Sequence, residues 1–500
     1  MKNIIKLVVI SLIMMASGSI ASAQQENQAQ VVNLQKEFEA MVENEVLGQA
    51  SVGICARTGD GRTIVDVNAD NMYIPASNMK LLSTGTALHA LGGDYSYKTG
   101  IAYDGSIIEG VLMGDLFIIG GGDPTLGSRD SIAVKTEQTF ALWEKMIRDA
   151  GISQIDGRVI GTSGDWFKGM MEEGTWMWGD IGTYYGAGVS GLMFYENVQS
   201  FEVSAGAAPG AAVNIKVSYP ECPWMEFRYD CCTGKAGTGD QLYLYTSELA
   251  PVAEVRGTFA ADKAAKRVDC SNKYPELTCA YYFRNWLNEH GIQCTGEAAD
   301  EKLRKIEKPD SLAIIGSSES PSLRRIAFET NHKSNNLYAE TLLRTLGKEL
   351  RQDGCYDSSY VAIRNTLKSL KVDTSRGLNI KDGSGLSMQN LVSPDFFCRY
   401  LTAMMSSPSF EDFAGSLPSP GGNGTLSYNM KNYPAATKER IKVKSGSMSG
   451  VRCYSGYIIP REGCKDETIV FSIMVNNCTA PTWKLRPLLD KMMGMLAEQN

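Results

Sequence analysis

The chain has 500 residues, of which 43% are hydrophobic and 21% charged, and this composition is typical of a globular protein with two or three hydrophobic cores. Its formal net charge of −7 makes it a poor partner for a polyanion, so we expect no nucleic acid to bind. After the N-terminal segment, no stretch reaches the roughly 18 apolar residues of a membrane span. We therefore expect no transmembrane anchor in the mature chain.

The first 23 residues predict a cleavable signal peptide. Lys2 and Lys6 form a basic region, residues 7–20 an apolar region, and Ala21-Ser22-Ala23 a small-residue cleavage site. The next residue is Gln24 and not Cys, which argues against a lipid-anchored start. We expect an exported, soluble mature protein with a periplasmic location.

Hydrophobic periodicity predicts α/β segments on both sides of a β-rich stretch. A helix over 31–46 leads to strands over 51–56 and 63–67, and then to a helix from Ser77 to Leu91. From about Tyr97 short strands, Gly-rich turns and aromatic residues follow, and α/β character returns after about Lys305. The later elements are helices from near Ser334 and over 394–405, strands over 440–444, 451–459 and 468–475, and a closing helix over 483–498. This order predicts one α/β domain split in sequence by an inserted β-rich region.

Ser77 and Lys80 form the first motif with catalytic potential, a Ser-x-x-Lys at the start of a predicted helix. Residues i and i+3 share a helix face, and the helix N-terminus adds unpaired N–H groups beside the hydroxyl. A serine acyltransferase needs these groups together, although about two such motifs arise by chance in a chain of this length. The sequence has three histidines and neither H-E-x-x-H nor G-x-S-x-G, so we expect an amine as the base of Ser77.

Two further motifs would complete an amine-based serine enzyme, and each occurs twice. Ser-x-Asn occurs at Ser334-Asn335-Asn336 and at residues 427–429, and the first is favoured because it begins a helical segment. Lys-Ser/Thr-Gly occurs at Lys444-Ser445-Gly446 and at residues 98–100, and the first is favoured because it ends a predicted strand near the C-terminus. On this interpretation Gly446 lets the substrate approach the strand.

The order of the three motifs resembles that of the penicillin-recognising serine peptidases. Longer segments are similar to the class C low-molecular-mass penicillin-binding proteins, the D-Ala-D-Ala carboxypeptidase/endopeptidase family of the penicillin-binding protein 4 type. The matching segments are residues 114–116 and 120–124, Tyr185-Gly186-Ala187, residues 333–337, residues 382–387 and Gly424-Thr425-Leu426. Gly188 stands where the family usually has Pro.

The resemblance implies an α/β fold, in which a transpeptidase-like domain has an antiparallel sheet with helices on both faces and carries inserted β-rich domains. The signal peptide would cover 1–23, the catalytic domain 24–96 and 305–500, one inserted domain 97–201 and 282–304, and a nested domain 202–281. The implied activity is a serine-type D-Ala-D-Ala carboxypeptidase, and also an endopeptidase, acting on peptidoglycan stem peptides. β-Lactams would be covalent inhibitors. A β-lactamase and a non-catalytic peptidoglycan or β-lactam receptor are the alternatives.

The roles of the site residues follow as hypotheses. Ser77 attacks the penultimate D-Ala, with Lys80 as base and Ser334 as proton relay. The pKa of Lys80 must fall from about 10.4 towards 7–8, and we expect the neighbouring charge of Lys444 to lower it. Further roles are binding of the substrate backbone by Asn336, binding of the carboxylate by Lys444 with Ser445, and oxyanion binding by the N–H groups of Ser77 and Ser447.

The resemblance also implies a subsite in the inserted region. The segment Trp176-x-Trp178-x-Asp180, with Tyr185, would form an aromatic wall of this subsite. There Asp180 would bind the free amine of the stem peptide, and Met448 would be its apolar companion. Ser384 and Leu386 either line the cleft or form a tight Gly-rich turn. Twelve cysteines, six of them between residues 222 and 294, predict disulfides in an exported chain. A zinc site is the less favoured interpretation of this cluster, and we expect no metal or cofactor.

Overall fold

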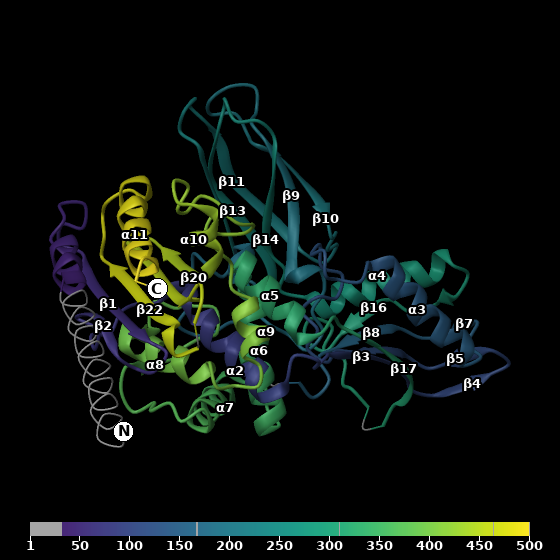
Figure 1. Cartoon of the computed structure of the whole chain (residues 1–500). Helices are drawn as coiled ribbons and strands as arrows, with labels where there is room; N and C mark the ends of the chain where they lie inside the picture. The colour runs from purple at the N-terminus through teal and green to yellow at the C-terminus, as the bar shows by residue number, and fades with distance from the viewer. Residues whose placement is uncertain (1–32, 167–168, 310, 464, 500) are drawn as a thin grey trace, which may run out of the picture.

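The computed structural model describes residues 33–166, 169–309, 311–463 and 465–499. The predicted signal peptide lies outside the described residues. Figure 1 shows three parts: an α/β part that contains both the first and the last strands, a tall lobe of long strands, and a further mixed part. None of the helices among the described residues combines the length and the hydrophobicity that a membrane span requires.

The α/β part is built on an antiparallel sheet of five strands in the order β2-β1-β22-β21-β20. The strands are β1 (Ser51–Thr58), β2 (Thr63–Val67), β20 (Ile441–Met448), β21 (Val451–Ile458) and β22 (Ile469–Asn476). β1 pairs over its full length with β22, from Ser51 opposite Asn476 to Thr58 opposite Ile469. The first strand of the chain is therefore held in the sheet by the last.

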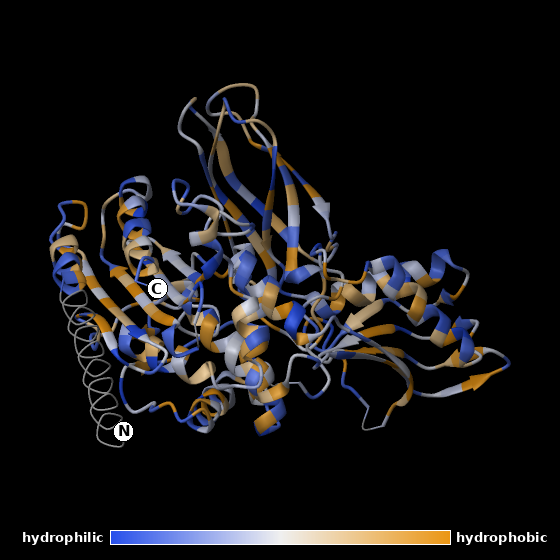
Figure 2. Ribbon diagram, in the orientation of Figure 1, coloured by the Kyte–Doolittle hydropathy of each residue, from blue (hydrophilic) through white to orange (hydrophobic). Residues whose placement is uncertain are grey.

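Helices cover both faces of this sheet, as the resemblance implies. Alternate residues of β1 point to opposite faces, so that Ile54 packs on one side and Cys55 on the other. One face is covered by the helical residues 33–42 and by α11 (Thr482–Ala497). The other face is covered by α2 (Met79–Leu91) and α8 (Pro394–Met404). Four further helices pack against α2 on that side: α5 (Leu323–Lys333), α6 (Asn336–Arg351), α7 (Tyr356–Ser369) and α9 (Phe410–Gly415). Burial on both faces explains the hydrophobic colouring of the central strands in Figure 2.

The mixed part contains one five-stranded and one four-stranded sheet, ordered β16-β8-β6-β3-β17 and β15-β7-β5-β4. Its elements are β3 (Lys98–Tyr103), β4 (Ser106–Ile108), β5 (Val111–Met113), β6 (Leu116–Ile119), α3 (Thr136–Asp149), β7 (Gln154–Ile155), β8 (Val159–Thr162), α4 (Pro275–Glu289), β15 (Gln293–Cys294), β16 (Ala298–Asp300) and β17 (Ala313–Glu319). β17 pairs with β3, so this sheet extends past the expected junction at residue 305. The division into domains itself remains a prediction.

The tall lobe consists of two three-stranded sheets, ordered β10-β9-β14 and β11-β13-β12 (Figure 1). Its strands are β9 (Val198–Ser204), β10 (Asn214–Tyr219), β11 (Glu226–Gly234), β12 (Asp240–Ser247), β13 (Ala250–Ala260) and β14 (Lys266–Ser271). The smaller elements of the chain are β18 (Leu378–Asn379), β19 (Leu391–Val392) and α10 (Ala435–Arg440).

The predicted disulfides are absent from the part of the chain that the structure describes, where eleven cysteines are free thiols. Cys231 and Cys232 are adjacent in β11, so their side chains leave opposite faces of the strand. Three other thiols of this region are buried and free, and burial raises the pKa of each: Cys222, Cys270 and Cys279. No group of three metal-ligating side chains occurs among the described residues, which does not support the zinc interpretation.

Candidate active site

Ser77 and Lys80 lie at the point where a single 3₁₀ turn, η1 (Ala76–Asn78), continues into α2. The Lys80 side chain is fully buried. Its Nζ lies 3.0 Å from Ser77 Oγ, 2.7 Å from Asn336 Oδ1 and 2.7 Å from the Ser384 carbonyl oxygen. Lys80 is thereby fixed beside the Ser77 hydroxyl by α6 and by the loop around Ser384.

The turn that carries Ser77 is held in an unusual backbone conformation. Ala76 has a φ of +46°, which a residue with a Cβ rarely adopts. Gly385 passes directly against it with a φ of +85°, and a Cβ at Gly385 would collide with the Ala76 carbonyl oxygen. The Gly-rich segment 382–387 therefore supports the backbone just before Ser77.

Lys444 reaches the same place from β20. Its fully buried side chain places Nζ 3.0 Å from Ser334 Oγ and 2.9 Å from the Ser445 carbonyl oxygen. The alternative Lys-Thr-Gly lies instead in β3, where Lys98 forms an ion pair with Glu319. The structure thus brings the three favoured motifs together, while the roles given to their residues stay predictions.

A close contact within the fold requires glycine at position 446. A Cβ at this position would collide with the Pro75 carbonyl oxygen and lie 3.0 Å from the Asn78 nitrogen. Glycine is needed here because β20 packs closely against the turn that carries Ser77, and the approach of a substrate to this strand stays a prediction. Ser445 Oγ lies 3.2 Å from Thr425 Oγ1, so two hydroxyls stand beside the Lys444 strand. The role of Thr425 was not predicted, although its segment carries part of the family resemblance.

Burial dominates the electrostatics of the two lysines. It lowers the pKa of Lys80 to about 7, against the opposing influence of the Asp382 and Glu340 carboxylates. Burial, and then the charge of Lys80, lowers the pKa of Lys444 well below its ordinary value. The expectation that Lys444 is the cause of the low Lys80 pKa is therefore wrong, because desolvation is the main cause.

Two buried acids beneath Lys80 escaped the sequence analysis as functional residues. The Glu340 carboxylate accepts the N–H groups of Gly383 and Ser384 at 3.0 and 2.7 Å, and burial raises its pKa to about 8. The Asp382 carboxylate accepts four hydrogen bonds at 2.6 to 3.0 Å, and burial raises its pKa as well. Glu340 lies four residues after Asn336, on the same face of α6, and this spacing is the signal that could have identified it.

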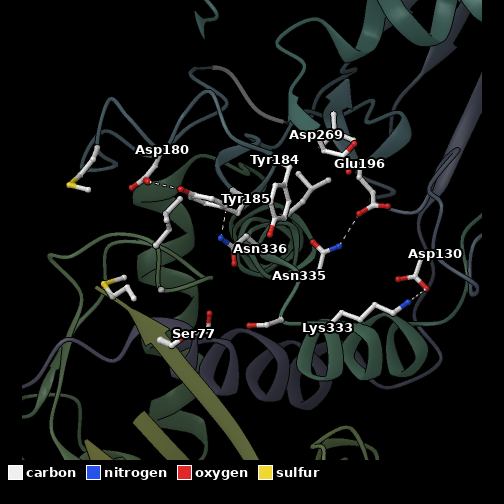
Figure 3. A pocket seen from close by; sticks show the side chains of 18 of the residues that line it. Ser77, Asp130, Asp180, Tyr184, Tyr185, Glu196, Asp269, Lys333, Asn335 and Asn336 are labelled. Carbon is white, nitrogen blue, oxygen red and sulfur yellow. Dashed lines mark hydrogen bonds and ion pairs between the residues drawn. The ribbon is translucent and has the colours of Figure 1, made fainter. Parts of the chain in front are cut away.

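Ser77 opens into a cleft with a volume of about 840 Å³, between the α/β part and the inserted region. The predicted residues that line it are Ser77, Asp180, Tyr185, Ser334, Asn336, Leu386, Ser447 and Met448. No histidine lines it among the described residues. Figure 3 shows Asp180 and Tyr185 above Ser77, with Asn336 between them and the serine. The Asn336 amide donates to the Tyr185 carbonyl oxygen at 2.8 Å, so α6 and the inserted region meet at this side chain.

Three other predicted residues differ from expectation. Trp176 is buried and donates its indole N–H to Asp382 at 3.0 Å, so it is not a wall of the cleft. Trp178 is 59% exposed and does not line the cleft, whereas the neighbouring Met177 does. Ser384 is fully buried and contributes its carbonyl oxygen to Lys80, so only Leu386 of this pair faces the cleft.

A comparison with protein families matches residues 34–499 to the D-Ala-D-Ala carboxypeptidase 3 (S13) family. The chain belongs to this family. It is 28% identical, over 93% of its length and 84% of the relative's, to a D-alanyl-D-alanine carboxypeptidase of Actinomadura sp. strain R39. It is 22% identical to the D-alanyl-D-alanine carboxypeptidase DacB of Haemophilus influenzae, over 85% of each chain. The predicted membership of the penicillin-binding protein 4 type is confirmed.

A solved structure confirms the predicted fold of this chain. The crystal structure of penicillin-binding protein 4 from Haemophilus influenzae superposes with a TM-score of 0.77 at 20% identity, covering 92% of this chain and 98% of that one. As a member of the S13 family, the chain is a serine-type D-Ala-D-Ala carboxypeptidase, the activity that the three motifs predict.

Proposed function

We propose that Ser77 is the nucleophile of this carboxypeptidase and that its substrates are peptidoglycan stem peptides ending in D-Ala-D-Ala. The observation that carries the proposal is the 3.0 Å contact between Ser77 Oγ and the buried amine of Lys80. Because the pKa of Lys80 is about 7, a large fraction of this amine is neutral at neutral pH and can accept a proton. Periplasmic location is proposed from the predicted signal peptide.

The reaction proceeds through an acyl-enzyme. Neutral Lys80 takes the proton of Ser77 as Oγ bonds to the carbonyl carbon of the penultimate D-Ala, and the N–H groups of Ser77 and Ser447 bind the oxyanion. The C–N bond breaks, the proton passes by way of Ser334 to the leaving amine, and D-Ala departs. Lys80 then deprotonates a water that attacks the ester, and the proton returns to Ser77 Oγ. Lys444, Ser445 and Thr425 bind the terminal carboxylate.

β-Lactams acylate the same serine in this proposal. A penicillin-binding protein 4 of Haemophilus influenzae, similar in fold to this chain, has been solved in complex with a β-lactam. The β-lactam carbonyl takes the place of the scissile amide, and the ring nitrogen is the leaving group that stays attached.

The first test incubates the purified protein with a pentapeptide stem and with penicillin and follows both by intact mass spectrometry. We expect D-Ala release and a penicilloyl adduct on Ser77, and neither with Ser77→Ala. Rapid loss of the adduct would identify a β-lactamase. Stem-peptide binding without D-Ala release, equal in Ser77→Ala, would identify a receptor and contradict the proposal.

Asp180 is proposed to select stem peptides with a free side-chain amine. Burial raises the pKa of its carboxyl, and Tyr185 Oη donates to it at 3.2 Å, so an ammonium group there would gain a poorly solvated partner. We expect Asp180→Asn to lower kcat/KM for a stem with a free diamino-acid amine about 10- to 100-fold. With the N-acetylated stem, wild type and variant should differ little. An equal loss with both stems would contradict the assignment.

A further inference from the structure

Asp180 stands on a loop of the inserted region whose two ends are joined at its base. The Val189 N–H donates to the Met171 carbonyl oxygen at 3.1 Å and so closes the loop. Arg344 of α6 contacts the same two residues, with Nη1 3.2 Å from the Met171 carbonyl oxygen and 3.3 Å from that of Val189. The base of the loop is therefore fixed to the α/β part, and the position of its tip, with Asp180, depends on further contacts.

The tip of the loop is a compact turn built around the backbone of Asp180. The Asp180 N–H donates to the Met177 carbonyl oxygen at 2.8 Å. Its own carbonyl oxygen accepts from the N–H and the hydroxyl of Thr183, at 2.9 and 2.6 Å. The Asp180 carboxylate also accepts from Tyr185 Oη. Because these contacts lie within the turn, the carboxylate moves with the backbone on which it stands.

The backbone directly after Asp180 is held by the tall lobe of Figure 1. The Ile181 carbonyl oxygen accepts two hydrogen bonds, each at 2.6 Å, from Lys273 Nζ and from Ser271 Oγ. Ser271 is the last residue of β14, and its N–H donates to the Gly182 carbonyl oxygen at 3.1 Å. A Cβ at Gly182 would collide with a carbonyl oxygen of β12. The tip is thus packed closely against the lobe at two successive residues.

Lys273 joins the base of the loop to its tip. Its side chain is 0% exposed, and Nζ lies 2.5 Å from Glu172 Oε1 as well as beside the Ile181 carbonyl oxygen. A buried ammonium group is costly unless it is paired and hydrogen-bonded, and these two partners supply both contacts. Replacing a buried ion pair by apolar side chains of similar volume is often neutral or stabilising. Stability alone therefore does not explain a lysine here, whereas a need to hold the carbonyl group beside Asp180 does.

We propose that Lys273 is a positioning residue for the Asp180 subsite and that the tall lobe serves the reaction through this contact. The inference rests on the proposed function, because it requires that Asp180 binds the side-chain amine of the stem peptide. A carboxylate and an ammonium group form a strong hydrogen bond only over a short distance, so displacement of the tip weakens recognition of the amine. Lys273 does not reach the substrate itself, since its side chain is fully buried.

The test compares a stem peptide that has a free diamino-acid amine with the same stem N-acetylated. In Lys273→Met we expect the ratio of kcat/KM for the free stem to that for the acetylated stem to fall about 10-fold, mainly through a higher KM for the free stem. Ser271→Ala keeps the buried ion pair and removes one of the two donors to Ile181, so its ratio should fall about 3-fold. Where Lys273→Met fails to fold, Ser271→Ala carries the same test.

Lys266→Met is the matched control, because it is the same substitution at the first residue of β14. The Lys266 side chain is 45% exposed and pairs with Asp240 within the lobe, so the ratio should keep its wild-type value.

A double-mutant cycle separates positioning from a general effect on the enzyme. In the Asp180→Asn background, Lys273→Met should leave the ratio where Asp180→Asn alone puts it, because both changes act on one contact. A further fall would show that Lys273 acts on the amine by another route and would overturn the inference. The tip also meets Asn336 through the Tyr185 carbonyl oxygen. If Lys273 acted only through that contact or through folding, both stems would lose equally, and the unchanged ratio would also overturn the inference.

The same assays separate this inference from the proposed function. If Asp180→Asn lowers the ratio but folded Lys273→Met keeps the wild-type ratio, the inference is wrong and the role of Asp180 stands. If Asp180→Asn keeps the wild-type ratio, the proposed role of Asp180 is rejected, and the inference with it.

Discussion

A Lys80→Met enzyme is expected to lose roughly a thousand- to ten-thousand-fold in the rate of acylation by penicillin and in kcat/KM for D-Ala release. The amine at 3.0 Å from Ser77 Oγ is the group placed to accept the serine proton, and no histidine lines the described cleft. The rates are measured by adduct formation and by chromatography of released D-Ala. Lys98→Met, the same substitution in the alternative Lys-Thr-Gly motif, is the matched control, because Lys98 is 66% exposed in another sheet.

The pH dependence of kcat/KM is a second, independent test of the role of Lys80. Lys80 must be neutral in the free enzyme, and burial lowers its pKa to about 7. Below this pH the amine is protonated, so kcat/KM should rise with pH, pass through half of its plateau near pH 7 and then level off. Residual activity in Lys80→Met should lack this step. A step that persists unchanged in the variant would assign the titration to another group and contradict the role of Lys80.

An Asp382→Asn enzyme is expected to be destabilised by about 3 kcal/mol or more. The Asp382 carboxylate accepts from the N–H groups of Gly385 and Ser387, the Asn390 amide and the Trp176 indole, at 2.6 to 3.0 Å. An asparagine has one acceptor oxygen, and its amide nitrogen would face donors. The loss is measured as a shift of the midpoint of urea unfolding.

Activity should fall with stability in Asp382→Asn, even at temperatures where the variant is folded. The carboxylate orders the segment that presents the Ser384 carbonyl oxygen to Lys80 and supports the Ala76 turn. Asp165→Asn is the matched control, since its carboxylate is 88% exposed and pairs only with Lys308 at 3.1 Å among the contacts described. Equal stability of the two variants would show that the four donors of Asp382 are satisfied without its charge.

The residues of the candidate active site could be predicted because they belong to short motifs with a defined spacing. Ser77 and Lys80 share a helix face by spacing alone, and the position of Lys444 at the end of a predicted strand separated it from Lys98. The disulfide prediction failed because composition reports how many cysteines exist and not how far apart the fold places them. Neighbours such as Cys231 and Cys232 point to opposite faces of one strand.

Contacts between segments that are far apart in the chain could not be predicted from the sequence. The residues around Trp176 predict an aromatic wall of the subsite. Its indole N–H instead donates to Asp382, which lies 206 residues later in the chain. The close packing of Gly446 against the turn before Ser77 also joins two segments far apart in the chain, and no motif predicts it. The low pKa of Lys80 was predicted in direction, but its cause is burial, which follows from the packing of α2 against α6 and not from any motif.

The pairing of β1 with β22 sets the order in which the enzyme can mature. Strand β1 lies between β2 and β22, so during synthesis its second edge stays open until β22 has been made. Lys444 arrives on β20, also late, and until then the segment around Ser77 lacks its second lysine. A chain that ends before β20 therefore holds Ser77 without Lys444 and leaves one edge of β1 unpaired, so the candidate active site is assembled only when the C-terminal strands join the sheet.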